Sequence, residues 1–392
     1  KIMRKQTGKT AFVAVAAAMS VITGVSAVPS VAAVDSVMEV ATASNLMRKA
    51  TETNVMRKAT DTNAVKRAME SGIQPENGIY DMEQDEIQAA LVSSTGDLWN
   101  QWTGASMDWS GSGTKSDPYK ITSISELMGL SEAVAQGESF RGIYFELQSD
   151  IDLGDLNLNN GSWNPIGWFQ NVSDLSGVPK AFEGTFDGAG NTISGLKFTK
   201  IDHTYSYLGL FGAIKNATIK NLVLEADEIS GQDKIGLLAG SVEGNSIIYG
   251  VKVSGVIYAD GNAGAIAGEV TGETKNAVIE NCVSEQIVLN SERKNSYIGG
   301  IAGNAQKVDV VDCSVSTQDG DTDRIRGKGY VGGILGRQNQ ANIYNVYVTG
   351  TFGGNLTKAV GGITGLYESG NIVTAVMDGE ISHTNNGVAS QE

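Results

Sequence analysis

A short phrase of glycine between aliphatic residues recurs six times in the C-terminal half of the chain and constrains its fold most. The leading glycines of successive copies lie 27, 28, 35, 33 and 29 residues apart. A repeat of about 20 to 50 residues is typical of a solenoid, in which one unit cannot bury its apolar face alone and must stack on its neighbours. The six copies are 208–211, 235–238, 263–266, 298–301, 331–334 and 360–363.

A second phrase, rich in Ile and Val, lies between successive glycine phrases and has strand character, as in 219–224 and 343–348. β-Branched residues favour strands, and no repeat leaves room for a helix of about ten residues beside its two strand phrases. The sequence therefore predicts an all-β fold, a right-handed parallel β-helix. Loops of different length are expected, because they can bulge outward without disturbing the stack.

One helix is predicted before the first coil. Ser123 and Glu126 have the spacing of a capping box, and Gly137 can end the helix, which we expect over about 124–136. Together with the first strands it would form an N-terminal cap over 95–160, since an uncovered first coil would expose unpaired backbone groups. The coils are expected over 161–392.

The N-terminal region has the layout of a secretory signal over residues 1–33. Four basic residues precede an apolar centre at 11–25, and small residues that suit cleavage follow. An uncleaved membrane anchor is the alternative. We expect cleavage, no membrane insertion afterwards, and a secreted or cell-surface location in a bacterium.

Residues 34–94 are predicted to be a spacer that is largely disordered or transiently helical. A nine-residue unit repeats at 45–53 and 54–62. Nine residues turn a helix by about 900°, so equivalent apolar residues fall on opposite faces and no continuous apolar stripe forms. A basic amphipathic membrane helix is the alternative. Because the first residue is not Met and no C-terminal anchor is visible, we expect the chain to be a fragment truncated at its C-terminus.

The charge balance argues against a nucleic-acid partner. The formal net charge is −15, and residues 71–392 hold 19 basic and 39 acidic residues, a net of −20. Such a body repels phosphate backbones.

Two positions recur in the strand phrases. Cys282 and Cys313 occupy the same place in successive copies, so stacked strands would put one above the other. We favour stacked buried thiols, and a disulfide remains open. Asparagine recurs in a neighbouring slot, once replaced by Asp, which predicts a partial corner ladder. Its members are Asn221, Asn281, Asp312 and Asn345.

No residue pattern indicates catalysis, a metal site or a cofactor. The acidic run 319–323 resembles the start of a calcium loop, but Arg324 and Tyr330 stand where Gly and Glu are needed. Neither His203 nor His383 belongs to a zinc-binding phrase. No carboxylate pair stands out for glycoside cleavage. The five tryptophans, all within 99–168, could stack on sugars, but packing in the cap is favoured. No binding residue is assigned.

Several phrases together resemble the GLUG-motif proteins. They are 113–119, 150–153, 163–167, 182–188 and the Gly-Leu-Phe-Gly phrase at 209–212, and the resemblance covers about 110–380. GLUG-motif proteins are secreted or surface-attached bacterial proteins, and related repeats occur in the N-terminal regions of immunoglobulin A metalloproteases and in Gram-positive adhesins. The chain holds no zinc phrase, so the resemblance does not imply peptidase activity.

These observations predict a non-catalytic extracellular module for adhesion or display. Its expected partner is a glycan or a protein of a host or cell surface. A β-helical carbohydrate-active enzyme and an accessory region of a larger secreted metalloprotease are the alternatives.

Overall fold

The computed structural model describes residues 104–155, 163–167, 180–198, 205–318, 324–355, 358–385 and 388–390. All of them belong to one compact unit, formed by Trp99–Gln170 and Val178–Glu392. The expected signal at 1–33 and spacer at 34–94 lie outside the described residues. No helix among the described residues has both the length and the apolarity needed to cross a membrane.

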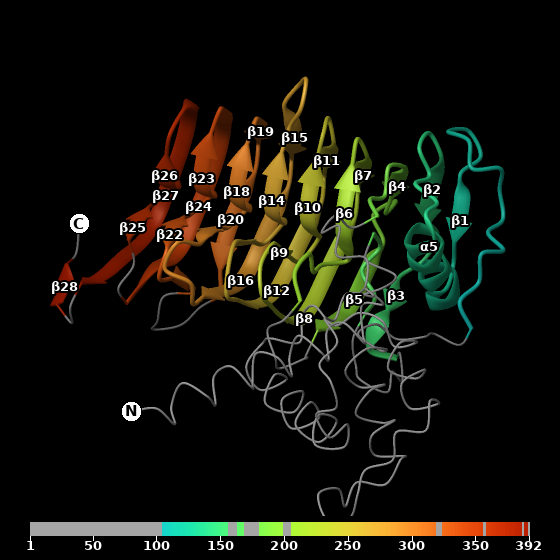
Figure 1. The fold of residues 1–392 in the computed structure, drawn as a ribbon, viewed down its shortest axis with the longest axis horizontal. Coiled ribbons are helices and arrows are strands. Elements are labelled where there is room, and N and C mark those ends of the chain that lie inside the picture. The colour runs from blue at the N-terminus through green and yellow to red at the C-terminus, as the bar shows by residue number, and fades with distance from the viewer. Residues whose placement is uncertain are drawn as a thin grey trace, which may run out of the picture. The chain divides into compact units, whose positions relative to one another are not determined.

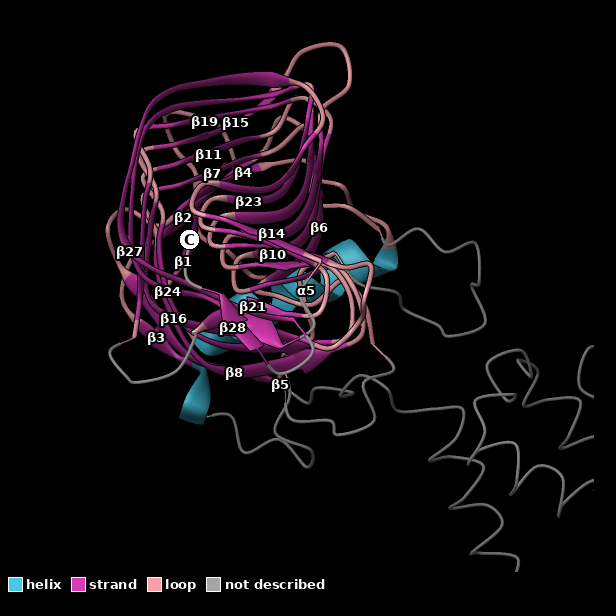
Figure 2. Cartoon of the chain, turned by 90° about the vertical axis from the view of Figure 1, so that its left-hand side faces the viewer, coloured by secondary structure: helices cyan, strands magenta, loops and turns pink. Residues whose placement is uncertain are grey.

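The chain winds through successive coils whose strands stack in parallel (Figure 1). A typical coil runs through β6 (Phe211–Lys215), β7 (Thr218–Lys220), β8 (Val223–Gly231) and β9 (Ile235–Gly236). The following coils repeat this order. Figure 2 looks along the stack and shows the strands of successive coils around a common interior. The structure thus confirms the predicted β-helix.

The strands form four walls, of which the first two belong to one 17-stranded sheet. The first wall contains β1 (Tyr119–Ile121), β2 (Tyr144–Leu147), β4 (Thr185–Asp187), β7, β11 (Ile247–Tyr249), β15 (Ala277–Glu280), β19 (Val308–Val311) and the first parts of β24 (Ala341–Asn355) and β27 (Gly370–Asn385). The second contains β3 (Ile151–Asp152), β5 (Thr192–Phe198), β8, β12 (Lys252–Ala259), β16 (Val283–Ser291), β20 (Ser314–Thr317), β21 (Ile325–Gly327) and the rest of β24 and β27.

The other two walls are separate sheets. The six-stranded wall contains β6, β10 (Ala239–Glu243), β14 (Ala267–Thr271), β18 (Ala302–Gln306), β23 (Leu335–Asn339) and β26 (Thr364–Tyr367). The five-stranded wall contains β9, β13 (Ala263–Gly264), β17 (Tyr297–Gly299), β22 (Tyr330–Gly332) and β25 (Ala359–Gly361).

The core consists of like residues stacked in register along the axis. On the first wall, each inward residue pairs with its counterpart in the next coil. This column is fully buried and consists of Phe186, Ile219, Ile248, Ile279, Val310 and Ile343. The columns therefore supply the shared apolar interior that single coils cannot form.

The corner between the first two walls requires a left-handed backbone in every coil. Asn221, Asn281, Asp312 and Asn345 all have φ between 51° and 53°, a conformation that Asn and Asp tolerate. The Asn221 amide donates to Asp187 Oδ1 over 3.0 Å, and the Asn345 amide donates to Asp312 Oδ1 over 2.5 Å. The predicted partial ladder is confirmed.

Helix α5 (Ile124–Gln136) lies at the N-terminal end of the stack (Figure 1). Its bounds follow from local signals: Ser123 Oγ accepts a hydrogen bond from the Glu126 amide, and Gly137 has φ 113°. Its buried face packs on the core, and Ser131 Oγ donates to the Asn164 carbonyl over 2.8 Å. The 3₁₀ turn η2 (Leu153–Asp155) follows β3.

At the other end, the last coil is only partly covered. The inward Ile372 is 43% exposed, whereas its partner Ile343 in the previous coil is 0% exposed. The short strand β28 (Val388–Ser390) pairs antiparallel with β27 only at residues 383–385. The two ends of the described stack therefore differ.

Candidate binding surface

The repeated glycines allow a sharp turn between the five-stranded and six-stranded walls. A Cβ on Gly236 would lie 2.2 Å from the Ala239 carbonyl oxygen, and one on Gly332 would lie 2.0 Å from that of Leu335. Each copy after the first also has a glycine four residues after the leading one, on the six-stranded wall. In β14 this is Gly268, where a Cβ would lie 2.3 Å from the Ile235 nitrogen of the previous coil. Only glycine fits these positions. The chain therefore turns sharply here, and side chains of the five-stranded wall come close to side chains of the six-stranded wall.

A continuous row of polar side chains runs along this junction across successive coils. Glu269, Asn304 and Arg337 are in register on the six-stranded wall. The Asn304 amide donates to Glu269 Oε2 over 3.0 Å, and Arg337 Nη1 donates to Asn304 Oδ1 over 3.2 Å. Lys234 Nζ lies 2.7 Å from Glu269 Oε1, and Arg337 makes a two-pronged pair with Glu368. We call Lys234, Glu269, Asn304, Arg337 and Glu368 the polar ladder.

Aromatic rings line the facing wall. Tyr297 and Tyr330 stack with ring centroids 5.6 Å apart and an angle of 24° between their planes. Arg337 lies 5.6 Å from the Tyr297 centroid, and Lys358 Nζ lies 5.4 Å from the Tyr330 centroid. Cations above tyrosine faces are attracted by the ring quadrupole. The junction thus combines ion pairs, amides and tyrosine rings in one repeated arrangement.

Pairing within the polar ladder shifts the pKa of Lys234, Arg337 and Glu368. Burial opposes the charge of Lys234, but its bonds to Glu269 and Tyr207 raise the pKa of its ammonium group well above the ordinary value. The hydrogen bond from Arg337 lowers the pKa of Glu368, and the bond to Glu368 raises the pKa of Arg337. A row of mutually paired ions suits binding and rigidity, whereas a general acid or base needs a pKa near the working pH.

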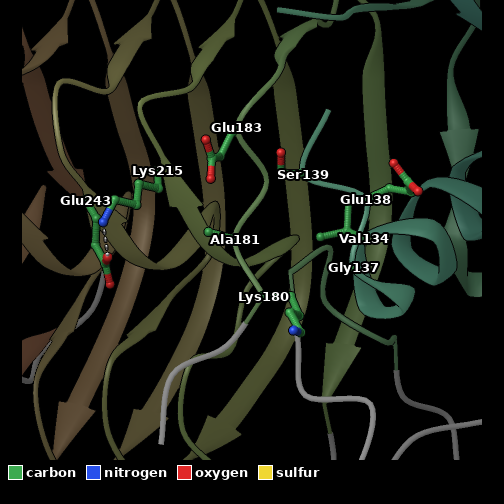
Figure 3. A pocket seen from close by; sticks show the side chains of 9 residues that line it. All are labelled: Val134, Gly137, Glu138, Ser139, Lys180, Ala181, Glu183, Lys215 and Glu243. Atoms are coloured by element: carbon green, nitrogen blue, oxygen red, sulfur yellow. Dashed lines mark ion pairs between the residues drawn. The ribbon is translucent and has the colours of Figure 1, made fainter. Parts of the chain in front are cut away.

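A hollow of about 310 Å³ lies where the end of α5 meets the β6 side of the stack (Figure 3). Two of its carboxylates are paired: Glu183 accepts a hydrogen bond from Arg141 Nε over 2.7 Å, and Glu243 lies 3.9 Å from Lys215 Nζ. The hydrogen bond to Glu273 raises the pKa of Lys215. The hollow is lined by Val134, Gly137, Glu138, Ser139, Lys180, Ala181, Glu183, Lys215 and Glu243.

The two cysteines lie where the repeat predicts them. Cys282 and Cys313 are buried in adjacent coils, and neither forms a disulfide. The hydrogen bond between the thiols, together with burial, raises the pKa of Cys313 well above its ordinary value. Both thiols are buried, and a buried free cysteine packs as a small hydrophobic residue, so the pair fills the core.

Two of the tryptophans lie within the described residues, and both are packed. The Trp109 ring contacts Phe145 edge-on at 5.2 Å, and Trp163 is buried with its Nε1 donating to the Leu210 carbonyl. The favoured interpretation as packing holds for these two. Run 319–323 and His203 lie outside the described residues, and in the part that the structure describes no group of His, Cys, Asp and Glu could hold a metal ion.

Sequence reasoning missed the polar ladder, although the sequence contains a signal for it. Glu269, Asn304 and Arg337 each lie five residues after the leading glycine of their copy, and Lys234, Tyr297 and Tyr330 each lie two residues before it. Alignment of the copies on that glycine would have collected both columns. The residue types differ from copy to copy, so no motif was visible without the register.

The fold and this junction define the chain as a parallel β-solenoid whose surface presents repeated ladders of side chains. No family model matches the sequence, so the GLUG resemblance stays a prediction.

Known proteins that are similar to it include three curated sequences and a solved structure. The chain is 30% identical over 164 residues to halomucin of Haloquadratum walsbyi. The match covers 42% of this chain and 2% of halomucin. It is 34% identical over 143 residues to the "Putative Gly-rich membrane protein" of Evansella cellulosilytica, and this match covers 36% of this chain and 14% of that protein. It is 27% identical over 252 residues to the immunoglobulin A1 protease of Streptococcus sanguinis, and this match covers 63% of this chain and 12% of the protease. The chain therefore spans 14% or less of the length of these relatives.

One similar solved structure is that of a "putative immunoglobulin A1 protease" from Bacteroides ovatus. The two share 21% identity and superpose with a TM-score of 0.57, covering 72% of this chain and 81% of the other. At this identity the likeness shows the fold alone, and it supports a β-solenoid independently of the repeats.

Proposed function

We propose that the chain is a non-catalytic β-helical module of a bacterial secreted or cell-surface protein, where it displays or binds a ligand. The observation that carries this proposal is the polar ladder, in which charged side chains neutralise one another along several coils. Paired ions give a rigid patterned surface, whereas a general acid or base needs a pKa near the working pH and an open position toward its substrate.

The comparisons support an extracellular setting. One relative is named a membrane protein, another halomucin, and a third immunoglobulin A1 protease. Each is much longer than the matched region, as expected if a module of this type is joined to other parts. An elongated stack suits such a role, because loops on a rigid scaffold are placed far from the point of attachment.

A second candidate is an accessory region of a larger protease. The match to the Streptococcus sanguinis protease covers 63% of this chain, which favours this alternative, and it covers only 12% of the protease. In this case the module would position the protease and would not cleave.

The test uses two measurements on the purified chain. It is incubated with a panel of polysaccharides and with immunoglobulin A1, and new reducing ends or new peptide fragments are measured. We expect neither. The same chain is probed on an array of glycans and host-surface proteins, where we expect saturable binding. Turnover at a rate proportional to the amount of chain would overturn the non-catalytic assignment, and absence of any binding would leave only a spacer role.

A further inference from the structure

Positive charge is concentrated on one part of this acidic chain. Residues 71–392 carry 39 acidic and 19 basic residues. Four of the basic ones lie on the three consecutive connections that lead into β17, β22 and β25, and a fifth, Arg326, lies on β21 directly before the second connection. In the described parts of these connections, Glu292 is the only acidic residue. We call Arg293, Lys294, Arg326, Lys328 and Lys358 the basic strip.

Contacts between coils show that the basic strip is continuous. Lys328 Nζ is paired with Glu292 of the previous coil. Lys358 Nζ donates to Asn295 Oδ1, and the Lys358 amide donates to the Gly329 carbonyl over 2.9 Å. Successive coils lie about 4.8 Å apart, so the three connections form one patch about 10 Å long.

The cations of the basic strip are available to solvent. Arg293, Lys294, Arg326 and Lys358 are exposed, and Lys328 is half-buried. Glu292 offsets one of these five charges, because its hydrogen bond with Lys328 and the charge of Arg326 lower its pKa, while burial opposes this. A local excess of four positive charges remains among the described side chains of the strip.

The strip adjoins the stacked tyrosines. Lys358 lies above Tyr330, which stacks on Tyr297. Tyrosine rings offer an apolar edge and a hydroxyl group, and together with cations they suit a ligand that carries both hydroxyl and acidic groups.

Building on the proposed function, we propose that the basic strip binds a linear acidic polysaccharide through its carboxylate or sulfate groups. A duplex nucleic acid fits less well, because its charges are dense and the net charge of −20 on residues 71–392 repels them. An acidic polysaccharide carries its charges further apart, with hydroxyl groups between them.

The test measures binding of the whole chain to hyaluronan and chondroitin sulfate oligosaccharides, with dextran and duplex DNA as comparison probes. The strip variant combines Arg293→Gln, Lys294→Gln and Arg326→Gln, whose side chains are exposed. The control variant removes the same charge elsewhere, with Lys115→Gln, Lys197→Gln and Lys275→Gln, which are also exposed. Thermal unfolding of both variants verifies that they fold.

We expect hyaluronan or chondroitin sulfate to bind the wild-type chain, and affinity to fall at least about tenfold in the strip variant but less than about twofold in the control. Binding should also weaken as salt rises from about 50 to about 200 mM, because counterion release contributes to it. Tyr330→Phe should retain the ring stack and lower affinity modestly if its hydroxyl contacts the sugar.

Three outcomes would overturn the proposal. Equal loss in both variants would show a general charge effect. Duplex DNA binding as tightly as the oligosaccharides would assign the strip to nucleic acid. Binding of a neutral glycan or host protein, without any acidic polysaccharide, would remove the ligand assignment and leave the proposed binding role intact. Turnover of the polysaccharide would instead contradict the proposed function.

Discussion

At the scale of single residues, the slots that repeat the same residue type could be predicted from the sequence. Asn recurs where the corner needs a left-handed backbone, and Cys282 and Cys313 share one slot, so spacing alone located both. The polar ladder could not be predicted in the same way. Its members differ in type, and their contact depends on a turn whose geometry only the structure shows.

Glycine at the tight junction is expected to be irreplaceable. In Gly268→Ala the new Cβ would lie 2.3 Å from the Ile235 nitrogen, so backbone must move, at a cost of about 3 kcal/mol. Gly137→Ala is the control, because its Cβ meets nothing within 4 Å and only the left-handed backbone, about 1 kcal/mol, is penalised. Urea unfolding measures both. Equal destabilisation would contradict the close packing of the walls.

Asp187 is expected to make the stack sensitive to acid. Burial opposes its charge, but bonds from Lys220, the Ala189 amide and Asn221 outweigh this and lower its pKa below the ordinary value. Its contribution to stability is therefore present above its ordinary pKa and is lost as the pH falls through the lowered value.

The measurement compares wild type with Asp187→Asn by urea unfolding at pH about 6 and pH about 2.5. The difference in unfolding free energy should be larger at the higher pH. Asp108→Asn, at an exposed position, is the control and should show no such trend. A difference independent of pH would contradict the role of the Asp187 charge.

At the scale of elements, the helix was predictable because its signals are local. Ser123, Glu126 and Gly137 stand at the positions that capping requires, and α5 spans Ile124–Gln136. The strands were harder to bound: β24 continues over both of its walls without a break, and register shifts occur between Val253 and Val256. Such bulges depend on neighbouring coils and not on local sequence.

The N-terminal cap of α5 can be tested by one substitution. Ser123→Ala removes the hydroxyl that accepts from the Glu126 amide and should lower the unfolding free energy by about 1 kcal/mol. Ser125→Ala, two residues on and inside the helix, is the matched control and should change it little. Both are measured by urea unfolding. A larger loss in the control would show that capping does not stabilise this helix.

At the scale of the whole stack, the repeat predicted the fold class because one rule, stacking of like positions, applies to every coil. The repeat does not predict what the loops carry. The basic strip arises from residues at three connections of unequal length. Their charges come close together only because the coils stack on one another. Surface chemistry therefore needs the structure even where the fold does not.

Stacking also predicts cooperative unfolding across coils. Tryptophan occurs only within 99–168, so tryptophan fluorescence reports the N-terminal end, while far-ultraviolet circular dichroism reports all strands. Val348→Ala creates a cavity in the buried core of β24, far along the stack, at a cost of about 2 kcal/mol. We expect both signals to shift together. Movement of the dichroism signal alone would indicate independent coils.

The contrast between the sealed end at α5 and the half-exposed Ile372 at the other has an evolutionary meaning. Each coil presents to the next coil the same kind of surface that it packs against in the previous one. An additional coil can therefore be added without changing those already present. Internal duplication can therefore lengthen such a protein stepwise while the first turns stay unchanged.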